Sequence, residues 1–418
     1  MKRTAPDRTA SQPKPVERVQ VQEGHVKARI IFLILALLIA VIAFAYAMGS
    51  ATQVDSGWRT VEADTAEMNC GQDFEFNYYL GGAGVSAAAE LKTLVIHYTE
   101  ACETAYRVFN AQELFEGVNN LCYLNQHPNT PVMVHPALYA AFEQMDALDS
   151  RYVYLGPVYA EYHSLFFCND DWETAGFDPY QNEDVRAYVA QAAAFARDPQ
   201  AIRVELLGNN TLRLTVSEEY LAFAQENGVT QLVDLHWMKN AFIIDYIAGS
   251  LQDKGYDRGA ISSYDGFVRC LGEEEISYSY HYYDLLEDTR ACKAARLNYP
   301  GDTALVYLRS FPLRNGKDLY YYQFEDGSVR TPYVDLRDGL SKASVPALIA
   351  TSRTAGCAET LLRILPFYAA DALDAPALQQ LTAEGIWPLY SLERQITAPS
   401  PDVALDQLFD GYTVVPNP

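Results

Sequence analysis

Residues 234–272 of this chain, DLHWMKNAFIIDYIAGSLQDKGYDRGAISSYDGFVRCLG, decide its fold class. The segment opens with Asp-Leu, and apolar residues at helical spacing then surround Asp245. A turn that contains glycine follows, and after it comes a short stretch with the alternation of a strand. A helix, a tight turn and a strand in this order predict a mixed α+β domain.

Composition and charge set the broad class of protein. The chain has 418 residues, of which 49% are hydrophobic, and this is enough for a substantial core. The net charge is −23, while seven basic and three acidic residues give residues 1–29 a charge of +4, which leaves −27 on the remainder. Nucleic acid is therefore not an expected partner, because binding it requires a basic face that neutralises phosphates.

An apolar segment lies near the amino terminus. Residues 30–48 contain no charged side chain, and at about 1.5 Å per residue they form a helix of roughly 28 Å, close to the thickness of a bilayer core. We interpret residues 1–29 as a cytoplasmic tail, 30–48 as a transmembrane helix and 49–65 as a linker. The basic residues on the amino side predict a single-pass protein of the cell membrane whose main domain, residues 66–418, is extracytoplasmic.

Two other interpretations of the apolar segment stay open. The sequence Ala45-Tyr46-Ala47 could serve as the cleavage site of a signal peptide, although a 29-residue leader is long for one. The segment could also be a buried core helix, but it has no polar face and would need protein on every side.

Periodicity predicts several further elements. Alternating apolar residues predict a strand at residues 74–80, and helical spacing follows in 86–109. Further helices are expected at 137–148 and 183–197. Strands are expected as a hairpin around Gly208-Asn209-Asn210, and at 305–309, 319–324 and 345–351.

The opening segment resembles the signature of the bacterial FAD:protein FMN transferases, the ApbE-like flavin transferases. In that family it runs roughly D-L-G-G-I-A-K-G-Y-A-V-D, and a helix and a strand ending in G-G-N follow. The spacing from Asp234 to Asp245 is the same in this chain. The paired glycines are replaced by His236 and Trp237, and the Lys-Gly pair by Asn240 and an alanine.

Two later segments carry the resemblance further. RTPYVDLRDG at residues 330–339 resembles H-H-I-I-D-P-R-T-G, with Asp335 retained but without the two histidines. AGCAETLL at residues 355–362 stands in the place of A-D-A-L-A-T-A-L, with Thr360 retained and Gly356 in place of the aspartate. The letters A-D-A-L do occur at residues 370–373, but about fifteen residues too late, so we treat them as coincidence.

The resemblance implies a fold, a reaction and two cofactors. The family transfers FMN from FAD to a Ser or Thr hydroxyl of a target protein, and Mg²⁺ is held by the Asp and Thr of A-D-A-L-A-T. Thr360 is thus the metal candidate, and no catalytic residue is assigned. The candidates for cofactor binding are Asp245, Asp265, Gly266 and Asp335.

Each candidate also has a structural interpretation. Asp245 could cap or pair within its helix, Thr360 could match by chance, and Asp265-Gly266 is a common turn-forming pair. His236 could exchange protons at neutral pH or could simply be packed in the core. If His236 and Trp237 filled the nucleotide cleft, flavin binding would be excluded.

These observations lead to two functional hypotheses. The first is a membrane-anchored pseudoenzyme that binds a flavin or a partner protein through a degenerate flavin-transferase-like site. The alternative is an active Mg²⁺-dependent transferase whose targets are flavin-carrying membrane redox proteins, as the family implies. Tyrosines alternate at 278–283 and cluster at 320–322, which predicts either an interaction surface or a stabilised edge strand.

Overall fold

The computed structural model describes residues 26–51, 54–65, 71–82, 84–168, 171–272, 276–286, 290–313, 320–409 and 411–416. The chain divides into two units, Met1–Val54 and Asp55–Pro418. The first unit contains helix α1 (Val26–Ala51), whose segment Lys27–Phe44 is long and apolar enough to cross a membrane. The side chains of that segment are all exposed, so none of it forms part of a protein core.

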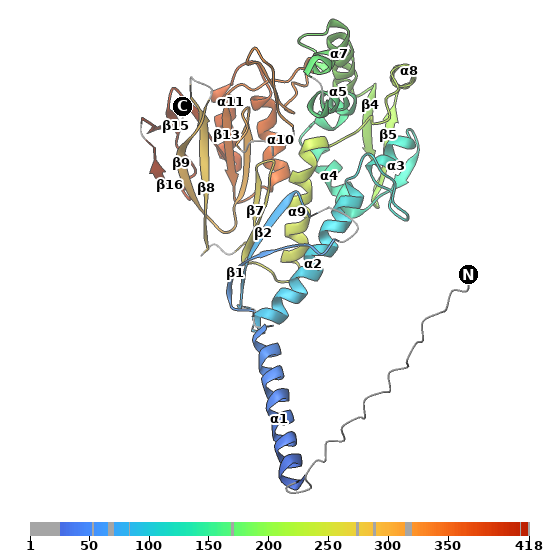
Figure 1. Ribbon diagram of the computed structural model, residues 1–418. Helices are drawn as coiled ribbons and strands as arrows, with labels where there is room; N and C mark the ends of the chain where they lie inside the picture. The colour runs from blue at the N-terminus through green and yellow to red at the C-terminus, as the bar shows by residue number, and fades with distance from the viewer. Residues whose placement is uncertain are drawn as a thin grey trace, which may run out of the picture. The chain divides into compact units, whose positions relative to one another are not determined.

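A nine-stranded sheet is the centre of the second unit (Figure 1). Its neighbouring strands are antiparallel except for the last pair, which is parallel. The strands, in their order across the sheet, are β1 (Gly57–Val61), β2 (Phe74–Leu80), β6 (Gly259–Ser263), β7 (Phe267–Cys270), β10 (Ala304–Arg309), β13 (Ala347–Ser352), β14 (Ile386–Leu392), β15 (Gln395–Thr397) and β17 (Thr413–Val415).

Strand β1 corrects part of the expected domain organisation. It lies within residues 49–65, which the sequence suggested as a linker, and it pairs with β2 along its whole length. Four of its five residues are at least partly exposed, so it lacks the clear apolar alternation that identified β2. Pairing with a neighbour that is distant in sequence forms this strand, and local periodicity does not predict it.

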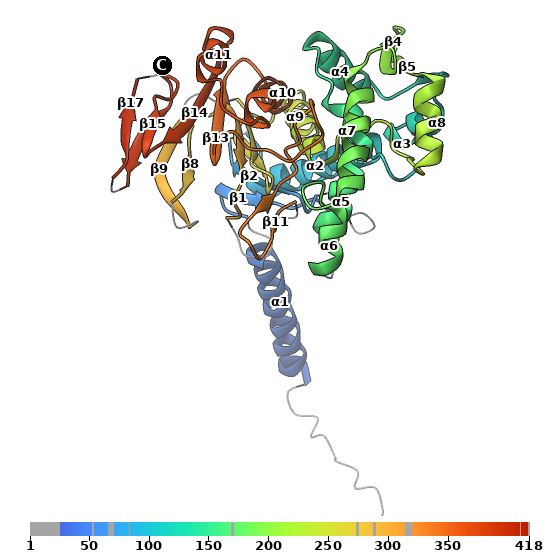
Figure 2. The ribbon, with the colours of Figure 1, turned by 90° about the horizontal axis from the view of Figure 1, so that it is seen from above.

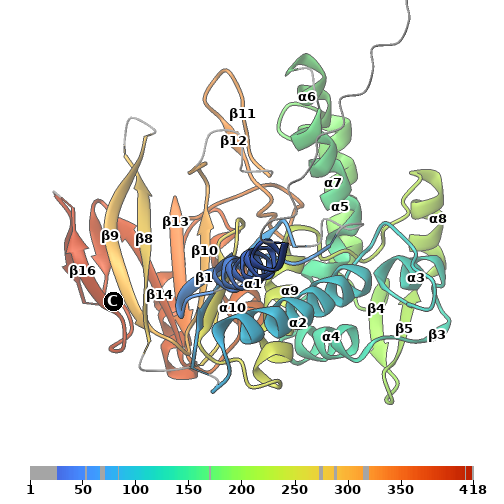
Figure 3. The ribbon, with the colours of Figure 1, turned by 60° about the horizontal axis from the view of Figure 1, so that its bottom comes forward.

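Three helices cover one face of this sheet: α2 (Ala87–Val108), α9 (Lys239–Gln252) and α10 (Cys357–Tyr368). Ser86 caps α2 by accepting the N–H of Ala89, which explains why the helix starts where the sequence predicted. Helix α9 contacts both of the others, and Figure 3 shows the three helices along the same side of the strands.

A second, smaller sheet covers the other face. It consists of β8 (Ser277–Leu285), β9 (Ala291–Pro300) and β16 (Ala404–Leu408), in the order β16-β9-β8. Tyr282 and Leu297 from this sheet pack with Leu305 and Tyr307 of β10. Helix α10 covers one face of β10 and the small sheet covers the other. Because alternate residues of a strand point to opposite faces, both sets of side chains have to be apolar, and Ala304–Leu308 are all buried.

A helical region extends from the other end of the helix layer (Figure 2). It contains α3 (Leu121–Gln126), α4 (Pro136–Ala147), α5 (Gly156–Phe167), α6 (Asp171–Phe177), α7 (Glu183–Arg197), α8 (Glu218–Glu226), and a sheet of β3 (Pro131–Met133), β4 (Ile202–Leu206) and β5 (Thr211–Val216). The predicted helices at 137–148 and 183–197 and the predicted hairpin are confirmed. Asn209 and Asn210 both have positive φ, as a tight hairpin turn requires.

The remaining elements are short. They are the 3₁₀ turns at Tyr152–Leu155, His236–Met238 (η2) and Gln380–Glu384, the helix α11 (Ala375–Gln379), and the hairpin β11 (Tyr322–Gln323) with β12 (Val329–Arg330). The strand expected at 319–324 is thus confined to β11 among the described residues, and residue 319 lies outside them.

A buried ion pair joins the helical region to this hairpin. Arg330 donates two hydrogen bonds of 2.8 Å to the carboxylate of Asp178, and both side chains are almost fully buried. The rings of Tyr180 and Phe324 contact the guanidinium at 4.1 and 5.2 Å. Because the pair is bidentate and enclosed, it fixes where residues 331–333 leave the hairpin.

Candidate functional site

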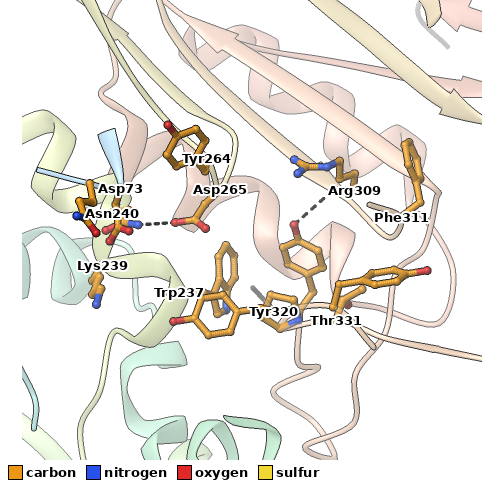
Figure 4. A pocket seen from close by; sticks show the side chains of 14 residues that line it. Asp73, Trp237, Lys239, Asn240, Tyr264, Asp265, Arg309, Phe311, Tyr320 and Thr331 are labelled. Atoms are coloured by element: carbon orange, nitrogen blue, oxygen red, sulfur yellow. Dashed lines mark hydrogen bonds between the residues drawn. The ribbon is translucent and has the colours of Figure 1, made fainter. Parts of the chain in front are cut away.

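A cavity of about 340 Å³ lies where η2 and the start of α9, the large sheet and the β11–β12 hairpin meet (Figure 4). We call it the aromatic pocket. Its walls are Gln72, Asp73, Trp237, Lys239, Asn240, Tyr264, Asp265, Arg309, Phe311, Tyr320, Tyr321, Thr331, Pro332 and Tyr333. Its volume is at the lower end of the range of about 300–1,000 Å³ that is usual for small-molecule sites.

The turn η2 brings the first functional side chains to this pocket. Its first residue, His236, has φ of +47°, a conformation that glycine adopts without cost but that strains other residues. The N–H of His236 donates to Asp234 at 2.8 Å, which helps to hold the turn. The chain has therefore kept the backbone shape suited to a glycine while carrying an imidazole there.

His236 is packed behind the pocket. Its ring stacks on Tyr159 at 5.2 Å with an interplanar angle of 11°, and it contacts Tyr320 at 4.8 Å. Burial, together with the positive charges of nearby groups, lowers the pKa of His236 to about 3. The imidazole is thus neutral at physiological pH, which favours packing over acid–base chemistry.

Trp237 forms one wall of the pocket and does not fill it. The indole is 3% exposed and lies nearly parallel to Phe267 and nearly perpendicular to Tyr333, at 6.4 and 5.0 Å. A cavity thus persists beside Trp237, in the region where the resemblance expects a nucleotide.

Asn240 and Asp265 come from distant elements and bind each other. The amide of Asn240, in the first turn of α9, donates a hydrogen bond to the carboxylate of Asp265, in the β6–β7 turn. Gly266 shapes this turn, because it has φ of +97° and a Cβ there would overlap the carbonyl oxygen of Tyr307. Asp265 thus lines the pocket, whereas Gly266 is buried and serves the backbone.

Burial raises the pKa of Asp265 to about 6, although the hydrogen bond from Asn240 opposes this shift. Asp234 behaves in the same way, since its burial raises the pKa of that carboxyl to about 6 as well. Both groups are therefore acids whose ionised form the folded protein disfavours.

Asp245 caps helix α10. Its two carboxylate oxygens accept the N–H groups of Cys357 and Ala358 at 2.9 and 2.8 Å. Gly356 precedes this helix, and a Cβ built on it would lie 2.7 Å from Cγ of Asp245. Burial raises the pKa of Asp245, while Arg269, whose Nε lies 3.8 Å from Oδ1, and the two amides oppose that shift.

The residues left in this region do not fit a Mg²⁺ site. Gly356 has no carboxylate, and both oxygens of Asp245 are already bound to the helix and face Arg269. Thr360 is fully buried, its hydroxyl has no hydrogen-bond partner among the residues that the structure describes, and it is not in the lining of the aromatic pocket. Within the described residues no cluster of three His, Cys, Asp or Glu side chains could hold a metal ion.

Asp335 lies in a separate ion-pair network. It accepts hydrogen bonds from Arg337 and Lys342 at 2.7 and 2.9 Å, and Lys342 also contacts Asp338 and Asp371. Burial raises its pKa, but these cations outweigh burial and hold the pKa of Asp335 below its ordinary value. Asp371, from the coincidental A-D-A-L sequence, therefore belongs to this network and does not line the pocket.

Several residues of the pocket escaped sequence reasoning. Asp73 precedes β2, Arg309 ends β10, and Tyr320 and Tyr333 flank the β11–β12 hairpin. Only the tyrosine cluster at 320–322 gave a signal, and it predicted either an interaction surface or a stabilised edge strand. Of the tyrosines at 278–283, Tyr282 is buried in the core, and an interaction surface formed by the others stays a prediction.

Comparison with known proteins supports the fold. No protein-family model matches the sequence, and no curated protein matches it. Among solved structures, the ApbE protein of Thermotoga maritima matches with a TM-score of 0.54 and 11% identity, over 79% of this chain and 93% of that one. The flavin transferase ApbE of Vibrio cholerae matches with a TM-score of 0.52 and 14% identity, over 84% of this chain and 96% of that one.

The second unit therefore has the α+β fold of the ApbE flavin transferases, and the prediction of this fold is confirmed. At these identities the likeness concerns the fold alone. What the site of this chain does has to be argued from its own residues.

The cap of α10 predicts strong coupling between positions 245 and 356. Gly356→Ala should destabilise the full chain by about 1–3 kcal/mol, because the methyl group overlaps the Asp245 carboxylate while φ of −76° suits alanine. In an Asp245→Ala background the same change should cost almost nothing. Denaturant unfolding in detergent micelles measures both values.

Gly249→Ala is the matched control, since a Cβ at that position in α9 meets no atom within 4 Å. It should be neutral or slightly stabilising. If the costs of Gly356→Ala and Asp245→Ala were simply additive, the overlap between the two side chains would be refuted.

The raised pKa of Asp265 predicts a pH effect of defined sign. Because its folded pKa of about 6 lies above the unfolded value, the group favours folding below about pH 4 and loses that contribution as the pH rises through 6. Asp265→Asn should therefore gain stability relative to the original protein between pH 4.5 and 7.5, by at most about 3 kcal/mol. Urea unfolding of both proteins at pH 4.5 and at pH 7.5 measures their free energies of unfolding. A difference between the two proteins that is the same at both pH values would contradict the prediction.

Proposed function

We propose that this protein is a membrane-anchored, extracytoplasmic pseudoenzyme with a flavin-transferase fold, which binds a flavin-like ligand without transferring FMN. The observation that carries the proposal is the position of the Asp245 carboxylate against Gly356, bound to the first N–H groups of α10. A carboxylate used in this way stabilises a helix and is not free to hold a divalent cation.

Loss of the metal affects the reaction more than it affects binding. Transfer of FMN from FAD breaks a pyrophosphate, and Mg²⁺ would stabilise the charge that develops on it. Within the described chain no cluster of three His, Cys, Asp or Glu side chains could hold this cation, Arg269 faces Asp245, and Thr360 is enclosed in the core. Binding of a planar ring needs only the aromatic and polar walls, and the pocket has both.

A direct assay of flavin transfer tests this proposal. The purified full chain, FAD and Mg²⁺ are incubated with a flavin-carrying redox subunit as acceptor, and covalent flavin is detected by in-gel fluorescence. We expect no labelled acceptor, while the Vibrio cholerae flavin transferase labels the same acceptor in parallel. Labelling by this chain, lost on Thr360→Val, would establish the alternative, an active transferase with divergent ligands.

We further propose that α1 anchors the chain once in the cell membrane, with residues 1–29 in the cytoplasm. The apolar segment and the basic residues before it support this orientation. Flavin-carrying membrane redox proteins are the partners that this location and the fold favour. They would be bound, and not modified, at the membrane surface.

Fusion of alkaline phosphatase after Pro418 tests the orientation in a bacterial host. The fusion should be active and remain in the membrane fraction, whereas the same fusion lacking residues 30–48 should be inactive. An active fusion released in soluble form, with a new amino terminus after Ala47, would show that the segment is a cleaved signal peptide.

A further inference from the structure

We propose that three aromatic residues near the start of β1, Trp58, Tyr79 and Tyr278, dock in the headgroup region of the bilayer that holds α1. We call them the aromatic patch. The inference rests on the proposed anchoring of α1, and it adds a direct contact between the second unit and the lipid surface. The partner is a neutral, zwitterionic phospholipid surface.

Two large rings of the aromatic patch are open to solvent. Trp58 is 47% exposed and Tyr79 is 40% exposed. They stand directly opposite each other on β1 and β2, and their rings meet edge to face at 5.6 Å. Cross-strand pairing explains why the two rings touch, but it does not explain why both stay uncovered. Exposed aromatic side chains that lie together indicate a surface that meets a partner or a membrane.

The core beneath the aromatic patch holds its rings in place. Trp58 contacts Tyr278 of β8 edge to face at 5.7 Å, and Tyr278 stacks on Tyr299 of β9 at 6.3 Å. Tyr299 belongs to the buried core between the two sheets. Because these contacts already restrict the rings, docking costs little side-chain entropy.

The same face of β1 and β2 becomes polar further along β1. Thr60 and Asn77 form the next pair on this face, and their side chains are hydrogen-bonded at 2.8 Å. Asn77 also donates to Glu75 at 2.9 Å. The rings of Trp58 and Tyr79 therefore lie at the end of β1 that is nearer to α1 along the chain, and the polar groups follow. This order suits a lipid–water interface, where Trp and Tyr rings lie at the level of the headgroups.

The chain limits how far Trp58 can lie from the bilayer. Helix α1 ends at Ala51, seven residues before Trp58, and seven fully extended residues span at most about 25 Å. This limit holds for any arrangement of the two units. A partner protein would have to be recruited to the aromatic patch, whereas the tether keeps the lipid surface within reach at all times.

The charges of the chain determine the kind of lipid. Asp55 and Arg59 are the nearest charged residues on either side of Trp58 in the sequence, both are exposed, and their formal charges cancel. The chain after residue 29 carries −27, so an anionic lipid surface repels the second unit as a whole. The attraction therefore comes from the aromatic rings, and a zwitterionic surface is the one that permits it.

Quenching by brominated lipid tests this docking. The full chain is placed in nanodiscs of phosphatidylcholine with brominated acyl chains, because bromine quenches only nearby tryptophans. All the tryptophans lie in the second unit, so α1 adds no signal. We expect weaker emission than in unbrominated nanodiscs, and Trp58→Phe should remove this difference. Trp387→Phe is the matched control and should keep it, because Trp387 lies on β14, six strands from β1 in the large sheet.

A second pair of variants separates docking from loss of the fluorophore. Tyr79→Asp keeps Trp58 but places a charge in the aromatic patch, so the quenching of Trp58 should be lost. Leu207→Asp places the same charge on another exposed apolar residue, in the β4–β5 hairpin, and should leave the quenching unchanged. The melting temperature of each variant shows that folded chains are compared.

The outcomes separate the docking from the anchoring. Nanodiscs that hold the chain without quenching it, quenching that persists in Trp58→Phe, or quenching that rises when phosphatidylglycerol is added would overturn the docking. Shielding of Trp58 from acrylamide without quenching by the lipid would also overturn it, and would show that a second copy or another protein covers the aromatic patch. A chain that does not enter the nanodiscs would overturn the proposed anchoring, and the docking with it.

Discussion

The carboxylate of Asp245 against the first turn of α10 is the contact on which the site depends. It satisfies two amide N–H groups that the helix cannot satisfy itself, and it places a negative charge at the positive end of the helix dipole. The contact also leaves no room for a side chain at position 356. One interaction thus joins α9 to α10, and it explains why residue 356 has no side chain.

The substitutions in the site come as matched sets. Glycine at 356 accompanies a carboxylate that reaches across from α9, and Asn240 accompanies Asp265, to which it is hydrogen-bonded. His236 occupies a glycine-like backbone conformation, and its ring is held between two tyrosines. Each of these residues thus makes a specific contact with another residue of the site.

Sequence reasoning was most successful where local physics decides structure. The capping serine at 86, the periodicity of 183–197 and the Gly-Asn-Asn turn act within a few residues, and the elements lie where they predicted. Strand β1 and the Asp178–Arg330 pair arise from contacts between distant segments, and nothing local marks them. The order of weak motifs still indicated the fold, because that order reflects the topology even where single residues have changed.

The site was only partly predictable for the same reason. Asp265 was singled out although it replaces a glycine of the family signature, and it does line the pocket, whereas Asp335, which matches its motif, belongs to an ion-pair network with Lys342. Agreement with a motif therefore did not decide which of the two residues reaches the pocket, and only the fold separates them. The interpretation of Asp245 as a capping residue was one of two open alternatives, and its hydrogen bonds to α10 match that one.

If Asp245 serves a helix in place of a metal ion, the chain should bind Mn²⁺ only weakly. Electron paramagnetic resonance of micromolar Mn²⁺, titrated with the full chain, reports how much of the ion stays free. We expect no tightly bound equivalent of Mn²⁺, and the same spectrum for the original protein and the Asp245→Asn variant. One tightly bound equivalent that disappears on Asp245→Asn would show that Asp245 holds a metal ion instead.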